Sequence, residues 1–520
     1  MSAPPEAVER RGPAESADAD PDLDAPDASA GALARAGAAV GWRGMGVLGG
    51  KLVALARTLV LARLLAPADF GLFAIALVPL EFLLGLTDVG MAPALVQRVE
   101  VARRDYDVAW TVGVLRGALI GVVLAAGAPV FAAACGDPRA TVFVRALAIR
   151  PVLVAVASVR VAELERRLRY RALVGIDLAA SVLGTAVALG FALSRGHWAL
   201  VAGNLSTVVV GTVASYVYAP YRPRFVVDPG RARELLRFGR WVLAGGIVGM
   251  IGEATLRAVI ARALGTDALG RYALATTLAT TPRDLTRPTI KTVAFAVHAR
   301  LQTDDREAGR AYRASIVALC AVLLPAYAAL VVLAPRLTAL FGPAWRGTAV
   351  VVQLLAAMAA LSLLYDATSP LLQGRGRPQT VVALYALASV TTVALVWPLA
   401  HAAGIAGAAL ARLGAELVVW VGCVQFARRA LDRPFQGLFR PLGAIAAAAL
   451  AGACAAAVVV RPVPGMAGLV AGGVGALAVT GLTFALLDRR LRLGVVDTLV
   501  AAVRPRLRSR PAAPAEPAGE

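Results

Sequence analysis

Apolar runs of about twenty residues recur along most of this chain, and they constrain its fold more than any other feature. They begin near Met45 and end near Leu487, and each is long enough to cross a hydrocarbon layer about 30 Å thick as a helix. Charged residues make up 17% of the chain, compared with about 25% in soluble proteins. The runs are continuous stretches of Ala, Val and Leu, without the period-two alternation of a membrane β-barrel. The sequence therefore predicts an all-α integral membrane protein.

Fourteen of these runs are expected to be transmembrane helices. They lie at 45–66, 71–97, 108–134, 140–160, 172–193, 198–219, 238–262, 268–297, 313–334, 348–372, 380–400, 404–427, 440–460 and 466–487. With a cytoplasmic N-terminus, the inner loops hold 31 Lys and Arg residues and the outer turns hold 5. Short cytoplasmic loops are enriched in these residues. The asymmetry predicts a multi-pass protein of the cytoplasmic (inner) membrane with both termini in the cytoplasm.

One segment occurs twice. Residues 60–76 and 259–275 align without a gap and match at seven of seventeen positions, including Gly71 with Gly270. Because six expected spans separate the copies, both enter the membrane in the same orientation, and two related six-helix lobes are expected with a substrate path between them. The expected organisation is a disordered tail (1–40), an N-lobe (41–220), a basic cytoplasmic linker (221–237), a C-lobe (238–430), two extra helices (431–490) and a basic, disordered tail (491–520).

Composition argues against several classes of protein. The net charge is +20, but the arginines lie in short loops between spans, as membrane topology requires, so no nucleic acid partner is expected. The four cysteines form no CxxC pair and the three histidines have no metal-ligand spacing, so we expect no metal, no other cofactor and no disulfide framework. The loops between spans are too short to hold a catalytic domain, and the sequence therefore predicts a protein that is not an enzyme.

Ionisable residues inside the spans are mainly basic. A charge near the bilayer centre costs about 2.5–3.5 kcal/mol on insertion scales, so it normally faces protein or water and marks a pathway. An excess of positive charge suits an anionic substrate such as a diphosphate. The residues expected to line such a cavity and bind the diphosphate are Arg57, Arg150, Arg257, Arg283, Arg287 and Lys291. The last three are four residues apart and share a helical face, on a helix that Pro282 and Pro288 are expected to kink.

Structural roles are the alternative for some of these residues. Glu81 and Glu253 are candidate coupling acids, but they can equally serve as ion-pair acids. Glu253 and Arg257 have the spacing of a structural i,i+4 pair, and Glu81 can neutralise an arginine of the neighbouring lobe. Arg63, Arg262 and Arg271 lie near the outer water layer, where long side chains reach the surface.

Several motifs together resemble those of a known family. Residues 62–71 (ARLLAPADFG), Asp88-Val89-Gly90 and 94–98 (ALVQR) resemble the polysaccharide-transport branch of the Wzx-type oligosaccharide flippases. Residues 264–272 (LGTDALGRY) resemble the second-lobe signature of that family. The resemblance covers roughly 42–490. One departure is Phe295-Ala296, where relatives often have Phe-Pro.

The resemblance implies both a fold and a function. It places the chain in a superfamily that includes multidrug antiporters and the peptidoglycan-precursor flippase, with two six-helix lobes around a central cavity. The implied activity is movement of an undecaprenyl-diphosphate-linked oligosaccharide to the outer leaflet by alternating access, for synthesis of O-antigen, capsule or exopolysaccharide. The implied partners are that lipid-linked oligosaccharide, the phospholipid bilayer, and the polysaccharide polymerase and glycosyltransferases of the pathway. A cation-coupled multidrug antiporter of the same fold and a membrane-bound glycan polymerase or ligase remain alternatives.

Overall fold

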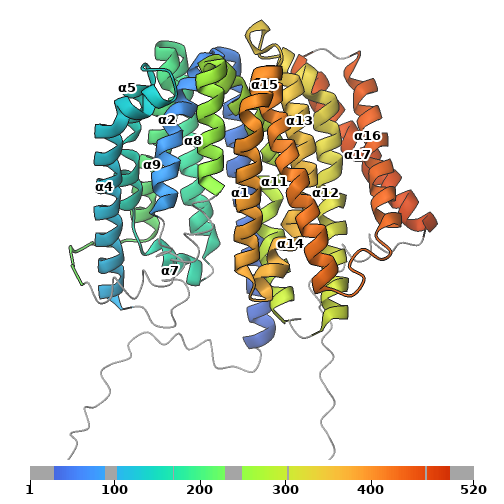
Figure 1. Cartoon of the computed structure of the whole chain (residues 1–520). Coiled ribbons are helices and arrows are strands. Elements are labelled where there is room, and N and C mark those ends of the chain that lie inside the picture. The colour runs from blue at the N-terminus through green and yellow to red at the C-terminus, as the bar shows by residue number, and fades with distance from the viewer. Residues whose placement is uncertain are drawn as a thin grey trace, which may run out of the picture.

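The computed structural model describes residues 28–87, 102–167, 169–228, 249–300, 304–462 and 465–491. Within its helices, the description leaves out the side chains at 28–43, 287–293, 295–296, 299–300 and 378. Regular secondary structure in the described residues is helical throughout, and the helices run along one another in a bundle (Figure 1). The prediction of an all-α membrane protein is confirmed.

The N-lobe contains the helices up to residue 218. They are α1 (Ala28–Leu64), α2 (Pro67–Leu86), α4 (Arg103–Ala134), α5 (Ala140–Leu147), α6 (Arg150–Ala155), α7 (Val161–Arg166), α8 (Tyr170–Arg195), the 3₁₀ turn η2 (Gly196–Trp198) and α9 (Ala199–Tyr218). The start of α1 lies within the segment 1–40 that we expected to be disordered, and residues 1–27 of that segment are outside the described residues.

The C-lobe is built from the helix at 249–264 and from elements that follow it. These are α11 (Thr266–Arg300), α12 (Asp305–Ala339), the 3₁₀ turn η3 (Pro343–Trp345), α13 (Thr348–Leu361), α14 (Leu363–Gly374) and α15 (Pro378–Ala430). α15 contains two spans, because Ala403 and Gly404 leave the helical region and Gly404 has φ 58°. Glycine adopts this backbone angle without the strain that a side chain would add.

Nine stretches of the described residues are long and apolar enough to cross a membrane. Two of them, 170–218 and 379–430, each contain two of the expected spans. The span expected at 140–160 is divided into the short helices α5 and α6, with Pro151 near the start of α6. The span expected at 238–262 is described only from Gly249 onward. These nine stretches support the all-helical membrane plan, while the total of fourteen spans stays a prediction.

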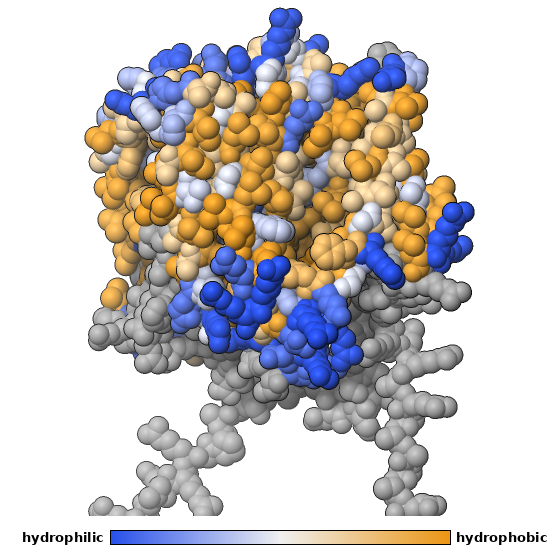
Figure 2. All heavy atoms as spheres, turned by 45° about the vertical axis from the view of Figure 1, so that its right-hand side comes forward, coloured by the Kyte–Doolittle hydropathy of each residue, from blue (hydrophilic) through white to orange (hydrophobic). Residues whose placement is uncertain are grey.

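The two ends of the bundle differ in the loops that they carry. We call the end with the turn between α1 and α2 the distal end, and the end where α4 begins the proximal end; they are the upper and lower ends in Figure 1. Figure 2 shows a broad hydrophobic band between hydrophilic residues gathered at the two ends. Many large apolar side chains of the bundle are highly exposed, among them Leu193, Val130 and Val217. A lipid-facing surface of this kind is what a membrane-spanning bundle requires.

The distal turn between α1 and α2 follows from its sequence. Pro67 is the first residue of α2, where its missing N–H and fixed φ suit a helix start. The Asp69 carboxylate accepts a hydrogen bond of 3.0 Å from the backbone N–H of Ala66. The residues that define the repeated motif therefore make a sharp reversal of the chain.

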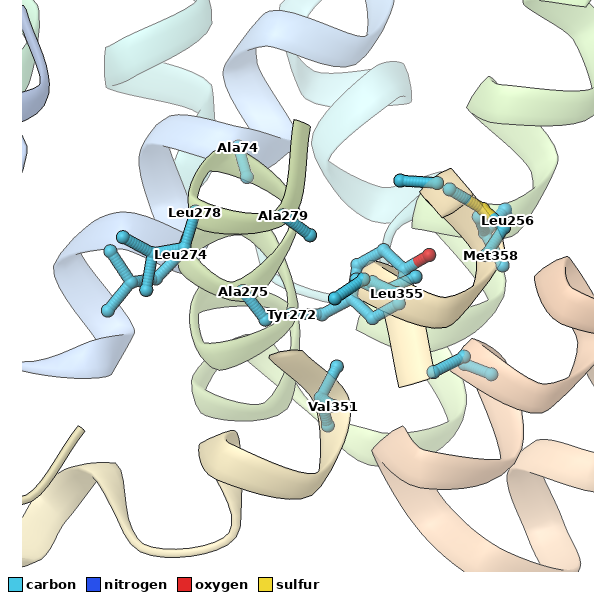
Figure 3. Packing of buried hydrophobic residues seen from close by; sticks show 14 of the residues in the cluster. Ala74, Leu256, Tyr272, Leu274, Ala275, Leu278, Ala279, Val351, Leu355 and Met358 are labelled. Atoms are coloured by element: carbon cyan, nitrogen blue, oxygen red, sulfur yellow. The ribbon is translucent and has the colours of Figure 1, made fainter. Parts of the chain in front are cut away.

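The two copies of the repeat meet each other where the lobes join. A Cβ atom on Gly71 would lie 2.0 Å from the carbonyl oxygen of Thr266, and one on Gly270 would lie 1.8 Å from the carbonyl oxygen of Pro67. These contacts let the backbones of α2 and α11 approach more closely than any other residue permits. Figure 3 shows α11 packed between α2 and α13, with Leu274 and Leu278 on the side of α11 that faces α2. The repeated glycine is therefore explained by a reciprocal contact between equivalent positions of the two lobes.

The last two described helices lie outside the repeat. α16 (Phe439–Val460) and α17 (Gly465–Leu491) pack on each other and on α12. Gly452 sits against the carbonyl oxygen of Ala476, and Arg336 of α12 donates a 2.8 Å hydrogen bond to the carbonyl of Val460. They form an outer layer on one side of the C-lobe (Figure 1).

Candidate functional site

A chain of ion pairs crosses from the N-lobe into the C-lobe. Glu81 of α2 accepts a 2.9 Å hydrogen bond from Nη1 of Arg257, which lies on the helix at 249–264. Arg257 also donates through Nε to Glu253, one turn earlier, at 3.2 Å. The second oxygen of Glu253 binds the guanidinium of Arg412 on α15. Glu253 therefore bridges two arginines, and Glu81 contributes a carboxylate from the opposite lobe.

A cavity of about 450 Å³ opens beside this chain within the C-lobe. Glu253 and Arg412 form one part of its lining, and Arg283 of α11 forms another. Arg283 makes a two-pronged ion pair with Asp366 of α14, with distances of 2.6 Å from Nε to Oδ2 and 2.7 Å from Nη2 to Oδ1. This fork geometry fixes both side chains.

Glu416 lines the same cavity without an ion pair of its own in the described part of the chain. The charges that act on it most strongly are Arg283, Arg412 and Asp366. It lies four residues after Arg412 on α15, and so projects on the same face of the helix. The cavity therefore contains a half-buried carboxylate that no guanidinium holds directly.

Arg57 and Arg150 differ from the other predicted basic residues. Both are half-buried, and neither guanidinium makes a hydrogen bond or salt bridge to another residue that the structure describes. The Nε atom of Arg150 is buried without a hydrogen-bond acceptor, and Glu81 is the carboxylate whose charge acts on it. Among the predicted site residues whose side chains the structure describes, these are the two arginines without a carboxylate partner.

Counting the acidic residues near the site shows which of its arginines have a carboxylate close by. Arg150, Arg257, Arg283 and Arg412 are matched by Glu81, Glu253, Asp366 and Glu416, which are close enough to act on them electrostatically. The excess of positive charge expected from the sequence is thus absent from this set of eight residues. Arg57 adds a cation to it. The side chains of Arg287 and Lys291 are outside the described residues, and their place in the site stays a prediction.

The structure thus brings together only some of the predicted site residues. Arg257 forms ion pairs with Glu81 and Glu253, and Arg283 opens into the same cavity as Glu253. Within the described part of the chain, no hydrogen bond or ion pair links Arg57 to these residues. Sequence reasoning left Arg412, Asp366 and Glu416 out of the site. The i,i+4 spacing of Arg412 and Glu416 was the available signal, but spacing on one helix does not reveal which side chain a neighbouring helix presents.

The bridging role of Glu253 leads to a stability prediction. Glu253→Gln keeps the size of the side chain but removes the negative charge that two guanidinium groups share. We expect it to lower the free energy of unfolding by about 2 kcal/mol, because Arg412 loses its direct carboxylate partner. The measurement is thermal unfolding of the purified protein in detergent.

Glu416→Gln is the matched control for this experiment. It removes a carboxylate from the same cavity, but one with no direct partner among the described residues, so the melting temperature should stay the same or rise. Equal losses for the two variants would show that the bridge contributes nothing specific.

At the distal end, polar contacts join the lobes. The hydroxyl of Thr266 donates a buried 2.6 Å hydrogen bond to Oδ2 of Asp137, in the turn between α4 and α5. Hydrogen bonds from Arg139 hold the pKa of the Asp137 carboxyl below its usual range, so it is an ionised acceptor at neutral pH. Arg63 donates to the carbonyl of Leu340 at 2.9 Å, again from one lobe to the other.

An aromatic contact also joins the two lobes at the distal end. The rings of Phe70 and Trp345 meet edge to face with centroids 5.3 Å apart, and Trp345 is almost completely buried. Arg262 reaches the carbonyl of Ala133 at 3.5 Å. Together with the Gly71 and Gly270 contacts, these interactions close the space between the lobes at the distal end.

Comparison with known proteins connects this architecture to a family. A family model described as polysaccharide biosynthesis protein matches residues 60–350, a stretch that includes both copies of the repeat and more than half of the chain. The chain is 28% identical over 348 residues to the succinoglycan biosynthesis transport protein ExoT of Rhizobium meliloti (strain 1021), covering 65% of this chain and 69% of ExoT.

Two further relatives show similar coverage. The teichuronic acid biosynthesis protein TuaB of Bacillus subtilis (strain 168) is 26% identical over 296 residues, which cover 56% of this chain and 61% of TuaB. The lipopolysaccharide biosynthesis protein WzxC of Escherichia coli (strain K12) is 24% identical over 331 residues, which cover 62% of this chain and 66% of WzxC.

Solved structures show the same fold. The lipid II flippase MurJ in an inward closed conformation superposes with a TM-score of 0.69 at 10% identity, covering 86% of this chain and 99% of MurJ. An inward-facing multidrug resistance transporter of the MATE family superposes with a TM-score of 0.59 at 18% identity, covering 75% of this chain and 96% of that transporter. The resemblance to Wzx-type polysaccharide transporters that the sequence motifs suggest is thereby confirmed, and the chain belongs to the polysaccharide biosynthesis protein family.

Proposed function

We propose that this protein is a flippase that moves an undecaprenyl-diphosphate-linked oligosaccharide from the cytoplasmic to the outer leaflet of the cell membrane. The observation that carries this proposal is the family match across both repeats, on a fold shared with a lipid II flippase. The relatives named for succinoglycan, teichuronic acid and lipopolysaccharide biosynthesis support surface polysaccharide synthesis as the process.

The proposed mechanism is alternating access without a chemical step. In this structure the distal end is closed by contacts between the lobes, and we assign that end to the outer face, with both termini cytoplasmic. The two lobes rock apart at the distal end to release the glycan, and close there to accept the next one from the inside. Glycosyltransferases supply the substrate and a polymerase consumes the product.

Within the proposed cargo, the diphosphate is the group that Arg57 and Arg150 of the N-lobe would bind. Arg57 and Arg150 offer guanidinium donors that no described carboxylate occupies, and guanidinium forks bind phosphate oxygens in pairs. Arg257 and Arg283 already form ion pairs with carboxylates. We therefore assign them a structural role in holding helices together, and they bind the diphosphate only if an ion pair breaks. The lipid tail stays in the bilayer, because moving it through a polar interior would cost about 0.8 kcal/mol per methylene.

The direct test is where lipid-linked intermediates accumulate when the gene is deleted. A flippase predicts that complete lipid-linked repeat units build up on the inner leaflet and that surface glycan is lost. Leaflet position is measured by access of the glycan to an added glycosidase in inside-out and right-side-out vesicles. Accumulation of short units on the outer leaflet would instead identify a polymerase or ligase.

One observation favours a second candidate, a cation-coupled multidrug antiporter. Glu416 lies in the C-lobe cavity without a direct cationic partner among the described residues, and such a carboxylate can take up and release a proton. This candidate predicts that the deletion strain becomes sensitive to several drugs while its surface glycan stays normal.

A further inference from the structure

A second cavity, of about 540 Å³, lies at the proximal end of the N-lobe. It is separate from the C-lobe cavity and from the residues discussed so far. Its charged lining residues come from the start of α4, from α7 and its flanks, and from the segment after α9; they are Arg103, Arg160, Glu163, Arg166, Arg167 and Arg222. Five arginines and one glutamate therefore converge on one pocket.

The three segments that form this pocket are held together by buried hydrogen bonds. Before α7, the hydroxyl of Ser158 donates to the carbonyl of Ala219 at 2.7 Å, and its backbone N–H donates to the hydroxyl of Ser215 at 2.9 Å. On the other side, the Tyr221 hydroxyl donates to Oδ1 of Asp107 on α4 at 2.5 Å. Burial and the Asp107 carboxylate raise the pKa of the Tyr221 phenol, so it remains a donor at neutral pH. These hydrogen bonds fix the relative positions of the three segments that carry the arginines.

The charged lining residues, five arginines and one glutamate, have an excess of positive charge, and Asp107, which accepts from the lining residue Tyr221, adds a second negative charge. Asp107 is occupied by Tyr221 and by the backbone N–H of Arg224, at 3.2 Å. Glu163 pairs with Arg160 and Arg167, each at 2.8 Å. Arg103 and Arg222 make no ion pair within the described part of the chain. This charge distribution favours a ligand with more than one negative charge.

The residues around this pocket are of the kinds expected at a membrane surface. The segment that carries Arg222 continues through Phe225 and Val227, residues that are 68% and 77% exposed. Phe225 packs edge to face on Trp110 of α4. Aromatic and apolar side chains exposed beside arginines are typical of the interface between lipid and water. A ligand reaching this pocket from the bilayer would place its head group among the arginines and its chains beside these apolar residues.

We propose that this proximal pocket binds the anionic phosphate head group of a membrane lipid, at a site distinct from the C-lobe cavity. The volume is typical of pockets for small molecules, and arginine forks suit phosphate oxygens. The source of the head group is either the diphosphate-linked cargo or an anionic phospholipid, which share this chemistry. Binding is measured without transport, so the outcome does not depend on the proposed flippase activity.

The test is native mass spectrometry of the purified full chain in detergent, titrated separately with undecaprenyl diphosphate, phosphatidylglycerol and phosphatidylcholine. We expect one or both anionic lipids to bind at least about tenfold more tightly than phosphatidylcholine, and Arg103→Gln with Arg222→Gln to weaken that binding about tenfold. The lipid that binds more tightly identifies the source. Arg429→Gln with Arg440→Gln, exposed at the proximal end of the C-lobe, is the matched control and should bind like wild type.

Two further variants keep the result interpretable. Arg222→Gln alone changes an exposed side chain and should fold normally while losing part of the affinity, and Arg103→Lys with Arg222→Lys should retain most of it. Affinity in Arg103→Gln with Arg222→Gln equal to wild type would overturn the proposal. So would equal binding of phosphatidylcholine, or binding of inorganic pyrophosphate as tight as that of the lipids, which would indicate a site for soluble anions.

Discussion

Arg57→Ala and Arg150→Ala should each reduce transport of the lipid-linked glycan at least tenfold, and together they should abolish surface glycan while the protein reaches the membrane in normal amounts. Hydrogen bonds to a charged group contribute about 1.5–3 kcal/mol each, so losing one guanidinium from the diphosphate costs tenfold or more in rate. The measurements are surface glycan on whole cells and leaflet transfer of labelled lipid-linked sugar in proteoliposomes.

Stability distinguishes a functional arginine from a structural one in this experiment. Arg57 and Arg150 have no direct carboxylate partner among the described residues, so their removal should leave the melting temperature unchanged or higher. Arg283→Ala, by contrast, removes the guanidinium that pairs with Asp366, whose side chain is only 6% exposed. This variant should therefore have a lower melting temperature. Arg145→Ala, an exposed neighbour in the same interrupted span, is the control and should transport normally. Wild-type glycan output from Arg57→Ala and Arg150→Ala would remove both from the site.

The helical membrane fold could be predicted from the sequence because the lipid bilayer limits which backbone structures can cross it. Each backbone polar group inside a bilayer needs an internal partner, so long apolar runs become helices. The repeat marks a place where the lobes meet, since Gly71 and Gly270 occupy equivalent positions and each lies against the opposite copy, but the sequence alone did not predict this contact. The span expected at 140–160 is an exception: it is divided after Leu147 into α5 and α6, and Pro151 lies at the start of α6, where a proline cannot donate a backbone hydrogen bond to the preceding helix.

The candidate site was harder to predict because the role of a charged residue inside a membrane depends on whether a residue on another helix forms an ion pair with it. Counting ionisable residues gave a cationic interior, but Arg283 reaches Asp366 across 83 positions of sequence, and Arg412 reaches Glu253 across 159. No local pattern encodes such pairs. Sequence can identify the residues that carry charge in the bilayer; only the packing of helices shows which of those charges are already satisfied.

Locking the distal end shut should stop transport completely. Asp137→Cys and Thr266→Cys place two thiols at positions whose side chains now share a 2.6 Å hydrogen bond across the lobes. A short, reducible thiol cross-linker should join them, and because the proposed cycle requires the lobes to part at this end, a cross-linked protein should show no glycan transfer. Reduction should restore the rate of the uncross-linked double variant.

The cross-link has to be made in a chain whose own cysteines are replaced, since Cys135 is two residues from Asp137 and Cys454 is exposed. Arg336→Cys with Val460→Cys, joined by a longer thiol cross-linker, is the control: the Arg336 side chain spans the gap from α12 to the carbonyl oxygen of Val460 on α16, and this pair does not bridge the two lobes. That cross-link should leave transport nearly unchanged, as α16 and α12 move together in a rocking lobe. Normal transport with the lobes joined at 137 and 266 would mean that the glycan leaves by a route that does not open between them, and alternating access at this end would have to be abandoned.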